Sequence, residues 1–481
     1  MATLVVQQKR IGLAHWMDEV LQQVEKVADG FKSDPVHDLR TALRRCRSMA
    51  DGLMVLDSDP AWKKMKKAGK QLFRSLGDLR DTHVLREWAE KLAPAEDAAA
   101  RNWQGLLDRR EQEFQNAAAV ALQDFDRSKW SGWAEYLPSR AARIPLESPV
   151  FSELALERWQ QARALQRRAL RNRTNVAFHD LRIGIKRFRY TVENFLPSLH
   201  ELWSNDLKEL QDALGDVHDL DVLWHIALSI KAFPDPASHL EWRARVQQER
   251  QKCLDKYRRK MVGLGSLWKT WRAALPKPEE LRGIGFRRLE IWAAFLDPNI
   301  RHSKHVAHLA LQLFDGLADR IPPAKRESCR YMLRAAAVMH DVGYAKANRG
   351  HHKASARMIR KLNAPLGWTA NEIRLISLVA RYHRGALPGE TQKTFSALPE
   401  SRRWIVQFLG GILRLACACD RHQDSHIRRV NVESSSPVLK VRAEGYAEAT
   451  PLAEHLAAAR YLLELADHRP VFILPSESHV A

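Results

Sequence analysis

Cysteine is scarce in this chain of 481 residues: there are only five cysteines, and no two of them have the Cys-x-x-Cys spacing. An odd number of isolated cysteines argues against a disulfide framework and indicates reduced, mostly buried thiols. A membrane-spanning run is missing too, because the longest apolar stretch, residues 404–419, contains Gln407 and Arg414 and is typical of a core helix. The first residues lack the pattern of a signal peptide. We therefore expect a soluble, cytoplasmic protein.

Acidic side chains are in short supply, since 57 Asp and Glu residues stand against 77 Lys and Arg residues and leave a net charge of +20. This excess favours a polyanionic partner: nucleic acid, an anionic membrane surface or a phosphate polymer. The sequence has no nucleic-acid recognition motif and no exposed aromatic residues interleaved with its basic ones, so nucleic acid is the weaker candidate. We expect no membrane partner.

Turn-forming residues are sparse between residues 8 and 275, where apolar residues recur with helical spacing. The turn-rich stretch 136–149 divides this region into two helical bundles, about 8–140 and 145–275. A second boundary, rich in proline and glycine, lies at 275–285. The helical pattern then resumes over 287–481, except for β-rich segments at 431–443 and 470–474. The predicted fold is mainly all-α, with a small β-rich α+β cap at the C-terminal end.

The two bundles repeat each other in sequence. Residues 36–48, VHDLRTALRRCRS, return at 178–190 as FHDLRIGIKRFRY, and residues 76–85, LGDLRDTHVL, return at 214–223 as LGDVHDLDVL. The separations of the paired blocks, 142 and 138 residues, are nearly equal. The first part of the chain is therefore predicted to be a duplicated unit.

Each repeat carries a row of basic residues on one helical face. Like charges one turn apart destabilise an isolated helix, so two matched rows indicate a bound anion rather than a face that only contacts solvent. Arginine binds phosphate oxygens through its planar guanidinium group, which favours a phosphate-rich ligand. A third row, at 62–74, is poorer in the second repeat, so the halves should bind unequally. The candidate ligand-binding residues are His37, Arg40, Arg44 and Arg47; His179, Arg182, Lys186 and Arg189; and Lys63, Lys67, Lys70 and Arg74.

These two repeated signatures resemble those of the CHAD family, the conserved-histidine α-helical domain, over residues 8–275. The resemblance implies two helical bundles related by pseudo-two-fold symmetry around a basic channel, and binding of inorganic polyphosphate.

The dipeptide His-Asp occurs four times, and one occurrence, His340–Asp341, is surrounded by other metal-binding residue types. Histidines precede it at 301–317 and follow it at 351–352 and 383, and an aspartate follows at 420. Imidazole and carboxylate groups accept Mn²⁺, Fe²⁺, Zn²⁺ or Mg²⁺, and residues on successive helices of a bundle can converge on one point. The segment is a candidate site for a divalent metal.

This order is similar to the HD phosphohydrolase pattern. RHSKHVAHLA, HDVGY, GHHKASA, RYHRGALP and LRLACACDR, followed by the β-rich tail, make residues 287–481 resemble the C-terminal helical domain of exopolyphosphatase/guanosine pentaphosphate phosphohydrolases. The histidines that flank these motifs, His305, His308 and His351, are expected to lie outside the ligand set. The metal ligands that the resemblance implies are His302, His340, Asp341 and Asp420 for a first ion, with His352 and His383 completing a second site.

Two functions remain open at this point. The first is a metal-dependent HD phosphohydrolase acting on polyphosphate or a guanosine polyphosphate, with His340 and Asp341 at the metal and Lys353, Arg381 and Arg384 stabilising charge on the phosphoryl group. The second is a non-catalytic polyphosphate receptor or granule-associated protein, whose HD-like domain binds ligand or mediates dimerisation.

Overall fold

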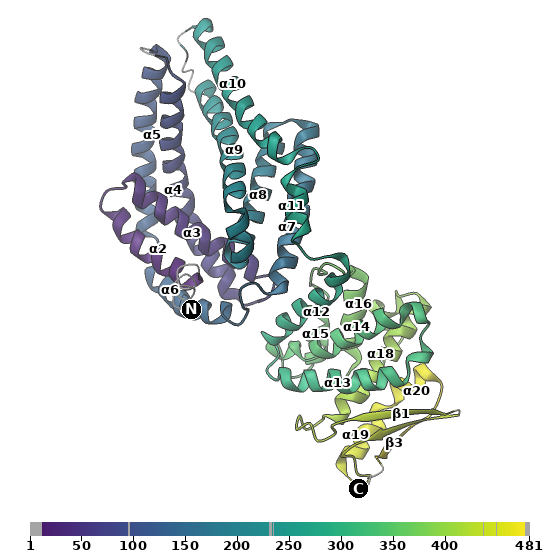
Figure 1. Cartoon of the computed structure of the whole chain (residues 1–481). Coiled ribbons are helices and arrows are strands. Elements are labelled where there is room, and N and C mark those ends of the chain that lie inside the picture. The colour runs from purple at the N-terminus through teal and green to yellow at the C-terminus, as the bar shows by residue number, and fades with distance from the viewer. Residues whose placement is uncertain are drawn as a thin grey trace. The chain divides into compact units, whose positions relative to one another are not determined.

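The computed structural model describes residues 12–94, 97–229, 233, 235–435, 437–448 and 450–476. These residues form two compact units, one ending at Lys277 and the other beginning at Pro278 (Figure 1). In the described part of the chain, no helix is both long enough and apolar enough to cross a membrane.

Among the described residues, the first unit contains two sets of five helices in the same order, and three of the five pairs have equal lengths. The helices that carry the repeated His-Asp motif have 21 residues in both sets, the helices after them have 33, and the next have 26. The duplication predicted from sequence is confirmed. The helices are α2 (Leu13–Ala28), α3 (Ser33–Leu53), α4 (Pro60–Leu92), α5 (Ala98–Gln123) and α6 (Arg127–Ala141), then α7 (Pro149–Asn172), α8 (Asn175–Phe195), α9 (Pro197–Ser229), α10 (Pro236–Met261) and α11 (Leu267–Ala273).

Local sequence signals explain where several of these helices begin. The side chain of Asp59 accepts a hydrogen bond from the Ala61 amide at 2.8 Å, and Pro60 opens α4. Thr174 caps α8 in the same way through the Ala177 amide, at 3.2 Å. Such caps satisfy amide groups that have no partner within the helix, and proline is preorganised for the first helical position.

The two repeats meet where α3 packs on α8 and α4 packs on α9. Gly52 makes this approach possible, because a Cβ atom there would overlap the ring of Phe195. The Phe195 ring stacks in turn on Phe151, with 4.2 Å between ring centroids. Arg45 forms an ion pair with Glu193 across the same seam. The seam brings the two His-Asp helices next to each other.

The second unit is a helical domain with a small sheet. Short 3₁₀ turns, η1 (Ala318–Arg320) and η2 (Val342–Ala345), connect some of its helices. The helices are α12 (Pro278–Ala294), α13 (Ile300–Gly316), α14 (Pro323–Met339), α15 (His351–Ile359), α16 (Ala370–Tyr382), α17 (Lys393–Ser396), α18 (Glu400–Cys419), α19 (Pro451–Ala459) and α20 (Tyr461–Asp467).

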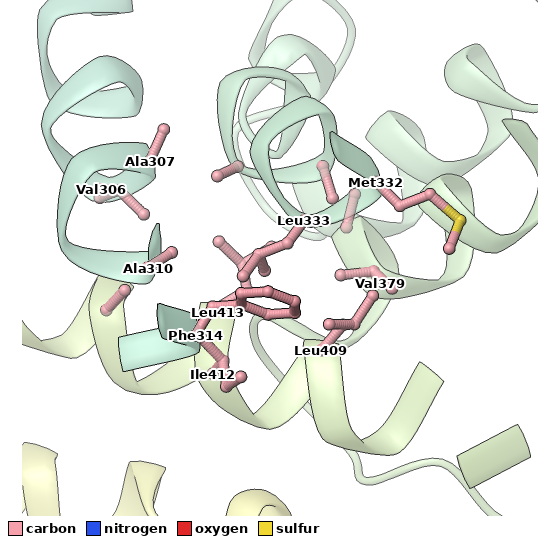
Figure 2. Close-up of a cluster of buried hydrophobic side chains, with 14 of the residues drawn as sticks. Val306, Ala307, Ala310, Phe314, Met332, Leu333, Val379, Leu409, Ile412 and Leu413 are labelled. Atoms are coloured by element: carbon pink, nitrogen blue, oxygen red, sulfur yellow. The ribbon is translucent and has the colours of Figure 1, made fainter. Parts of the chain in front are cut away.

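The core of this unit lies where α13, α14, α16 and α18 face one another. Figure 2 shows the labelled side chains from these four helices gathered in one cluster, with the Phe314 ring among them. Phe314, Leu333 and Leu413 are almost fully buried. The apolar run that the sequence assigned to a core helix forms most of α18. This packing fixes the positions of the helix ends, where the candidate metal residues lie.

The sheet has the order β1–β2–β3. β1 (Val430–Ser435) and β2 (Val438–Ala443) form an antiparallel hairpin in which Val430 pairs with Ala443. β3 (Val471–Pro475) runs parallel to β2, with Leu439 opposite Val471, after the chain has passed through α19 and α20. The predicted mainly all-α fold with a small C-terminal α+β cap is therefore confirmed.

Candidate metal centre and anion-binding cluster

Four of the predicted basic residues lie together at the seam between the repeats. Arg40 and Arg44 come from α3, and Arg182 and Lys186 come from α8. All four side chains are half-buried, and Lys186 experiences the charge of each of the three arginines. We call these residues the seam cluster.

The surroundings of Lys186 in the seam cluster disfavour its positive charge. Burial, followed by repulsion from Arg182 and Arg44, lowers the pKa of Lys186 to about 7. Burial also raises the pKa of the neighbouring Asp219 to about 6, against the opposing effect of Arg182. Lys186 is therefore only partly protonated near pH 7. A bound anion would raise its pKa and restore the full positive charge.

The guanidinium groups of the cluster also have unused donors. Arg40 Nη1, Arg44 Nε and Arg182 Nε are buried without a hydrogen-bond partner among the described residues. Arg40 lies against Gly77, where a Cβ atom would come within 2.7 Å of its Nη1, and its guanidinium stands 5.2 Å from the ring centroid of Phe73. Buried donors without acceptors are costly, so a site of this kind fits a ligand rich in oxygen acceptors.

The remaining residues of the basic rows are placed less uniformly. Arg47 stands 4.9 Å from the Phe73 ring centroid and experiences the charge of Arg74. Arg189 is 3.6 Å from the Glu193 carboxylate and so has an acidic neighbour. The other predicted residues of these rows are surface-exposed on α3 and α4, namely His37, Lys63, Lys67, Lys70 and Arg74.

His179 differs from its counterpart His37, because it is half-buried and has a histidine partner. Its Nδ1 lies 3.3 Å from Nδ1 of His218, the first residue of the last His-Asp pair in the duplicated unit. In the first repeat the position equivalent to His218 is occupied by Arg80. The rows alone did not identify His218 or the aromatic residue Phe73, although the aligned repeat blocks contain or adjoin both.

The candidate metal residues lie at the ends of helices in the second unit. His302 is in the first turn of α13, His340 and Asp341 directly follow α14, and His351 begins α15. His383 follows α16 and Asp420 follows α18. The ends of five helices therefore meet at one buried point, as successive helices of a bundle allow.

Asp341 lies at the centre of this group of residues, and each of its carboxylate oxygens faces two histidines. Its Oδ2 lies 3.4 Å from His340 Nε2 and 3.8 Å from His302 Nε2. Its Oδ1 lies 3.3 Å from His351 Nε2 and 3.8 Å from His383 Nε2. All five residues are buried. We call them the Asp341 cluster.

The other ring nitrogen fixes the tautomer of three of the four histidines. His340 Nδ1 donates to the Ala337 carbonyl at 2.6 Å, and His383 Nδ1 donates to the Ala380 carbonyl at 2.7 Å. Each acceptor lies three residues earlier, in the last turn of a helix, where carbonyl groups lack helical partners. Since a carbonyl oxygen can only accept, these Nδ1 atoms carry the proton and their Nε2 atoms present lone pairs to Asp341.

His302 follows the same pattern, whereas His351 has only a long contact at Nδ1. His302 Nδ1 donates to Asp420 Oδ2 at 2.6 Å, and His351 Nδ1 faces the Asn348 carbonyl at 3.4 Å. Burial lowers the pKa of His351 and places that of His383 well below its usual range, which keeps both rings neutral. Their Nε2 atoms are nevertheless only 3.2 Å apart.

A backbone contact ties the His340–Asp341 turn to α15. The Gly343 amide donates to Ser355 Oγ at 2.8 Å, and Ser355 Oγ donates to the His340 carbonyl at 2.6 Å. A Cβ atom at Gly343 would overlap the His351 carbonyl. This contact holds the first turn of α15, with His351, directly against the His-Asp motif.

The structure departs from the expected arrangement at His352, His351 and Lys353. His352 is only half-buried, its ring centroid is 6.2 Å from that of His383, and it belongs to neither of the two ligand-type groups, whereas His351 belongs to one. Lys353 is exposed and lines a pocket that contains no residue of the Asp341 cluster. Asp420 stands behind His302 as its hydrogen-bond partner. The neighbouring histidines 351 and 352 could not be told apart by spacing alone.

Comparison with known proteins agrees with this division of the chain. Residues 12–228 match the model of the CHAD domain, and residues 292–456 match the model of Ppx/GppA phosphatase, domain III. The chain joins a CHAD domain to a Ppx/GppA-like domain. A solved structure, the CHAD domain from the plant Ricinus communis, aligns with 20% identity and a TM-score of 0.40 over 55% of this chain and 90% of that chain. No curated protein matches the chain in sequence.

The CHAD domain match contains all four residues of the seam cluster, and the Ppx/GppA-like match contains the whole Asp341 cluster. A pocket of about 420 Å³ opens onto the Asp341 cluster. Three arginines line it, Arg384, Arg414 and Arg421.

A divalent cation fits the residues of the Asp341 cluster. Asp341 Oδ1 is buried and has no hydrogen-bond donor among the described residues. The Nε2 atoms of four histidines surround the two oxygens of Asp341, and an Nε2 lone pair repels a carboxylate unless a cation lies between them. Imidazole nitrogen and carboxylate oxygen are ligands for Mn²⁺, Fe²⁺ and Zn²⁺, and the carboxylate also suits Mg²⁺. The Nδ1 hydrogen bonds are the supporting contacts that metal-binding histidines usually have.

Proposed function

We propose that this protein binds inorganic polyphosphate through its CHAD domain, and that its Ppx/GppA-like domain is a metal-dependent phosphohydrolase acting on polyphosphate or on a guanosine polyphosphate. One observation carries the catalytic part of the proposal: four histidines direct Nε2 toward the two oxygens of Asp341. The proposed location is the cytoplasm, in association with polyphosphate granules.

Asp341 has a separate role on each of its oxygens. His302 and His340 would hold an ion with Oδ2, and His351 and His383 would hold a second ion with Oδ1, which matches the two ligand-type groups at this point. Divalent ions supply Lewis acidity toward phosphoryl oxygens and lower the pKa of water. The buried setting of the five side chains strengthens every charge interaction at the site.

Arginines at the mouth of the pocket would bind the phosphate groups of the substrate. Arg384 and Arg421 are exposed there, and Arg414 is oriented by a hydrogen bond to the Gly385 carbonyl. Arg414 Nη1 has no hydrogen-bond partner among the described residues, which leaves a fixed donor for a phosphate oxygen. Guanidinium groups in such positions stabilise charge on a phosphoryl group during its transfer.

The seam cluster would hold the polymer in the CHAD domain. Its unused guanidinium donors and its partly charged Lys186 are the features that support phosphate binding there. A polymer held at many points by basic residues binds in a salt-dependent manner, because its counterions are released.

Two measurements on the full chain test the proposal. Elemental analysis of the purified protein should find one to two divalent ions per chain. Phosphate release from polyphosphate and from guanosine tetraphosphate should occur with Mn²⁺. Asp341→Ala should remove both the metal and the activity, because it deletes the anion that both ions would share.

His308→Ala is the matched control, since His308 is exposed and bonded only to Gln312 among the described residues. It should leave metal content and phosphate release unchanged. Asp341→Asn keeps the volume of the side chain and guards against a folding defect in the alanine variant. A protein that binds metal and polyphosphate yet releases no phosphate from either substrate class would be a receptor, and the hydrolase assignment would be wrong.

A further inference from the structure

A second pocket, of about 540 Å³, lies between α15 and α16 in the Ppx/GppA-like domain. No residue that lines it belongs to the Asp341 cluster, and none is acidic. Five basic residues line it: Lys353, Arg357, Arg360, Arg374 and Arg381. We call it the α15–α16 pocket.

The spacing of these residues shows that the cations come from two facing rows. Lys353, Arg357 and Arg360 are separated by four and three residues, and Arg374 and Arg381 by seven. Both spacings place side chains on one face of a helix, and α15 packs against α16. Two helices therefore direct like charges into one cavity, which destabilises the helices unless an anion binds there.

None of the five cations forms an ion pair within the described part of the chain. Elsewhere in the same unit arginines commonly do, as Arg330 does with Asp315 at 2.8 Å and Arg320 with Asp467 at 2.7 Å. Arg381 Nη1 is buried and lacks any hydrogen-bond acceptor among the described residues. The charges of this pocket are therefore available to a ligand.

Neutral residues complete the walls of the pocket. Leu378 and Ala356 contribute apolar surface to the lining, and Thr394 and Gln392 belong to the segment around α17. Tyr382 donates to Gln392 and fixes that segment against α16. The pocket is half-open: four of its basic residues, Lys353, Arg357, Arg360 and Arg374, are exposed, and Arg381 is half-buried.

We propose that the α15–α16 pocket binds a compact anion with several linked phosphate groups, separately from the Asp341 cluster. A single phosphate carries about two negative charges and would leave most of the five cations unneutralised. A linked di- or triphosphate matches the charge better, and the guanidinium groups bind its oxygens in pairs. The phosphates can come from a short inorganic oligophosphate or from the tail of a nucleotide.

Chemical footprinting of the full chain tests this site without interference from the CHAD domain. Lysines are acylated and arginines modified with a dicarbonyl reagent, with and without inorganic triphosphate, and the sites are quantified by mass spectrometry. We expect Lys353, Arg357 and Arg374 to be protected at least about fivefold. Lys325 and Arg402, which are exposed and line neither pocket, should react equally in both samples.

A parallel sample with guanosine triphosphate in place of inorganic triphosphate identifies the source of the phosphates. Protection by both ligands means that the phosphates are sufficient, and protection by the nucleotide alone means that the base contributes. Either result supports the pocket. The absence of protection by both ligands, or equal protection of Lys325 and Arg402, overturns the proposal.

The double variant Arg357→Ala/Arg374→Ala removes one cation from each row. It should abolish the protection of Lys353, whereas Lys325→Ala/Arg402→Ala, with the same loss of charge, should not. Both variants should retain their metal content, because no ligand-type residue changes. Persistent protection of Lys353 in the first variant would contradict the proposal, while metal-free protein with a protected pocket would contradict only the hydrolase assignment.

Discussion

Nδ1 of His302 donates to Asp420 Oδ2 across 2.6 Å, and this bond turns Nε2 of the same ring toward Asp341. Asp420 receives a further hydrogen bond from the Ser425 amide at 2.8 Å, on its other oxygen. The last aspartate of the motif is therefore a fixed support for the first histidine.

The first prediction concerns this support. We expect Asp420→Ala to weaken metal binding about 10–100-fold, the usual effect of losing a group that orients a metal-binding histidine. Asp420→Asn should lose less, because an amide oxygen can still accept from Nδ1. Competitive titration with a chelator measures both. If Asp420→Asn loses metal as completely as Asp341→Ala does, Asp420 is itself a ligand.

The second prediction separates two adjacent histidines. His351→Ala should weaken binding of one ion by more than the roughly 10–100-fold that follows loss of a supporting group, because Nε2 itself is removed. His352→Ala should change the affinity less than about threefold. Isothermal titration with Mn²⁺ on the metal-stripped protein compares them, and circular dichroism checks folding. The reverse order of effects would show that His352 is the ligand.

The third prediction concerns the seam cluster. A hydrogen bond to a charged group is worth about 1.5–3 kcal/mol, so replacing Arg40, Arg44, Arg182 and Lys186 with alanine should lower the affinity for long-chain polyphosphate at least about 100-fold. The slope of log affinity against log salt should fall by about 0.7 for each lost contact, as for single-stranded nucleic acids.

The control for that variant removes four cations of α10, Arg243, Lys252, Lys256 and Arg259. These side chains are exposed and lie outside the seam. Calorimetry should show a much smaller loss of affinity for the control. Equal losses would mean that bulk charge binds the polymer.

The fourth prediction is a pH dependence. Lys186 has a pKa of about 7 without ligand, and a bound polyanion raises it, so binding takes up a proton at pH values above 7. Affinity for long-chain polyphosphate should therefore rise as pH falls from 9 toward 7. It should rise further through pH 6, where Asp219, with a pKa of about 6, loses its negative charge.

Lys186→Arg keeps the positive charge at all these pH values and should flatten the part of the profile above pH 7. Calorimetry in buffers of different ionisation enthalpy counts the protons directly. Unchanged proton uptake in the arginine variant would assign the effect to another group.

The fifth prediction concerns the seam between the repeats. Gly52→Ala would force a methyl group into the Phe195 ring, and overpacking of this kind costs about 1–3 kcal/mol. Gly132→Ala, within α6 and with nothing within 4 Å of its Cβ position, should instead stabilise the unit by about 0.5–1 kcal/mol. Thermal unfolding followed by circular dichroism should shift in opposite directions for the two variants.

The repeat, the helical class and the β-rich cap could be predicted because each leaves a local trace in the sequence. The His-Asp blocks recur at fixed offsets, and the β-rich segment predicted at 431–443 forms the hairpin of β1 and β2. The parallel placement of β3 on β2 could not be predicted, since it depends on how the chain returns through α19 and α20.

The candidate site could be predicted only in part, for a geometric reason. His302, His340, Asp341 and His383 stand at helix ends, and their order along the chain indicated a cluster. Which of two neighbouring histidines faces Asp341 depends on the angle at which α15 leaves Gly350, a residue with a positive φ of 74°. Nor does spacing reveal that Lys353 and Arg381 share a different pocket from Arg384.

Gly343 shows that the His-Asp motif is part of a longer sequence pattern. There is no room for a Cβ atom at Gly343, and Ser355 is hydrogen-bonded both to the Gly343 amide and to the His340 carbonyl. These contacts hold the turn and the start of α15 together as one rigid unit. A chain that keeps this backbone needs His-Asp-x-Gly followed by a serine or a similar small hydroxyl residue twelve positions after the glycine. The dipeptide alone, which this chain contains four times, is a poor search pattern, whereas the longer pattern selects the one occurrence that is surrounded by histidines.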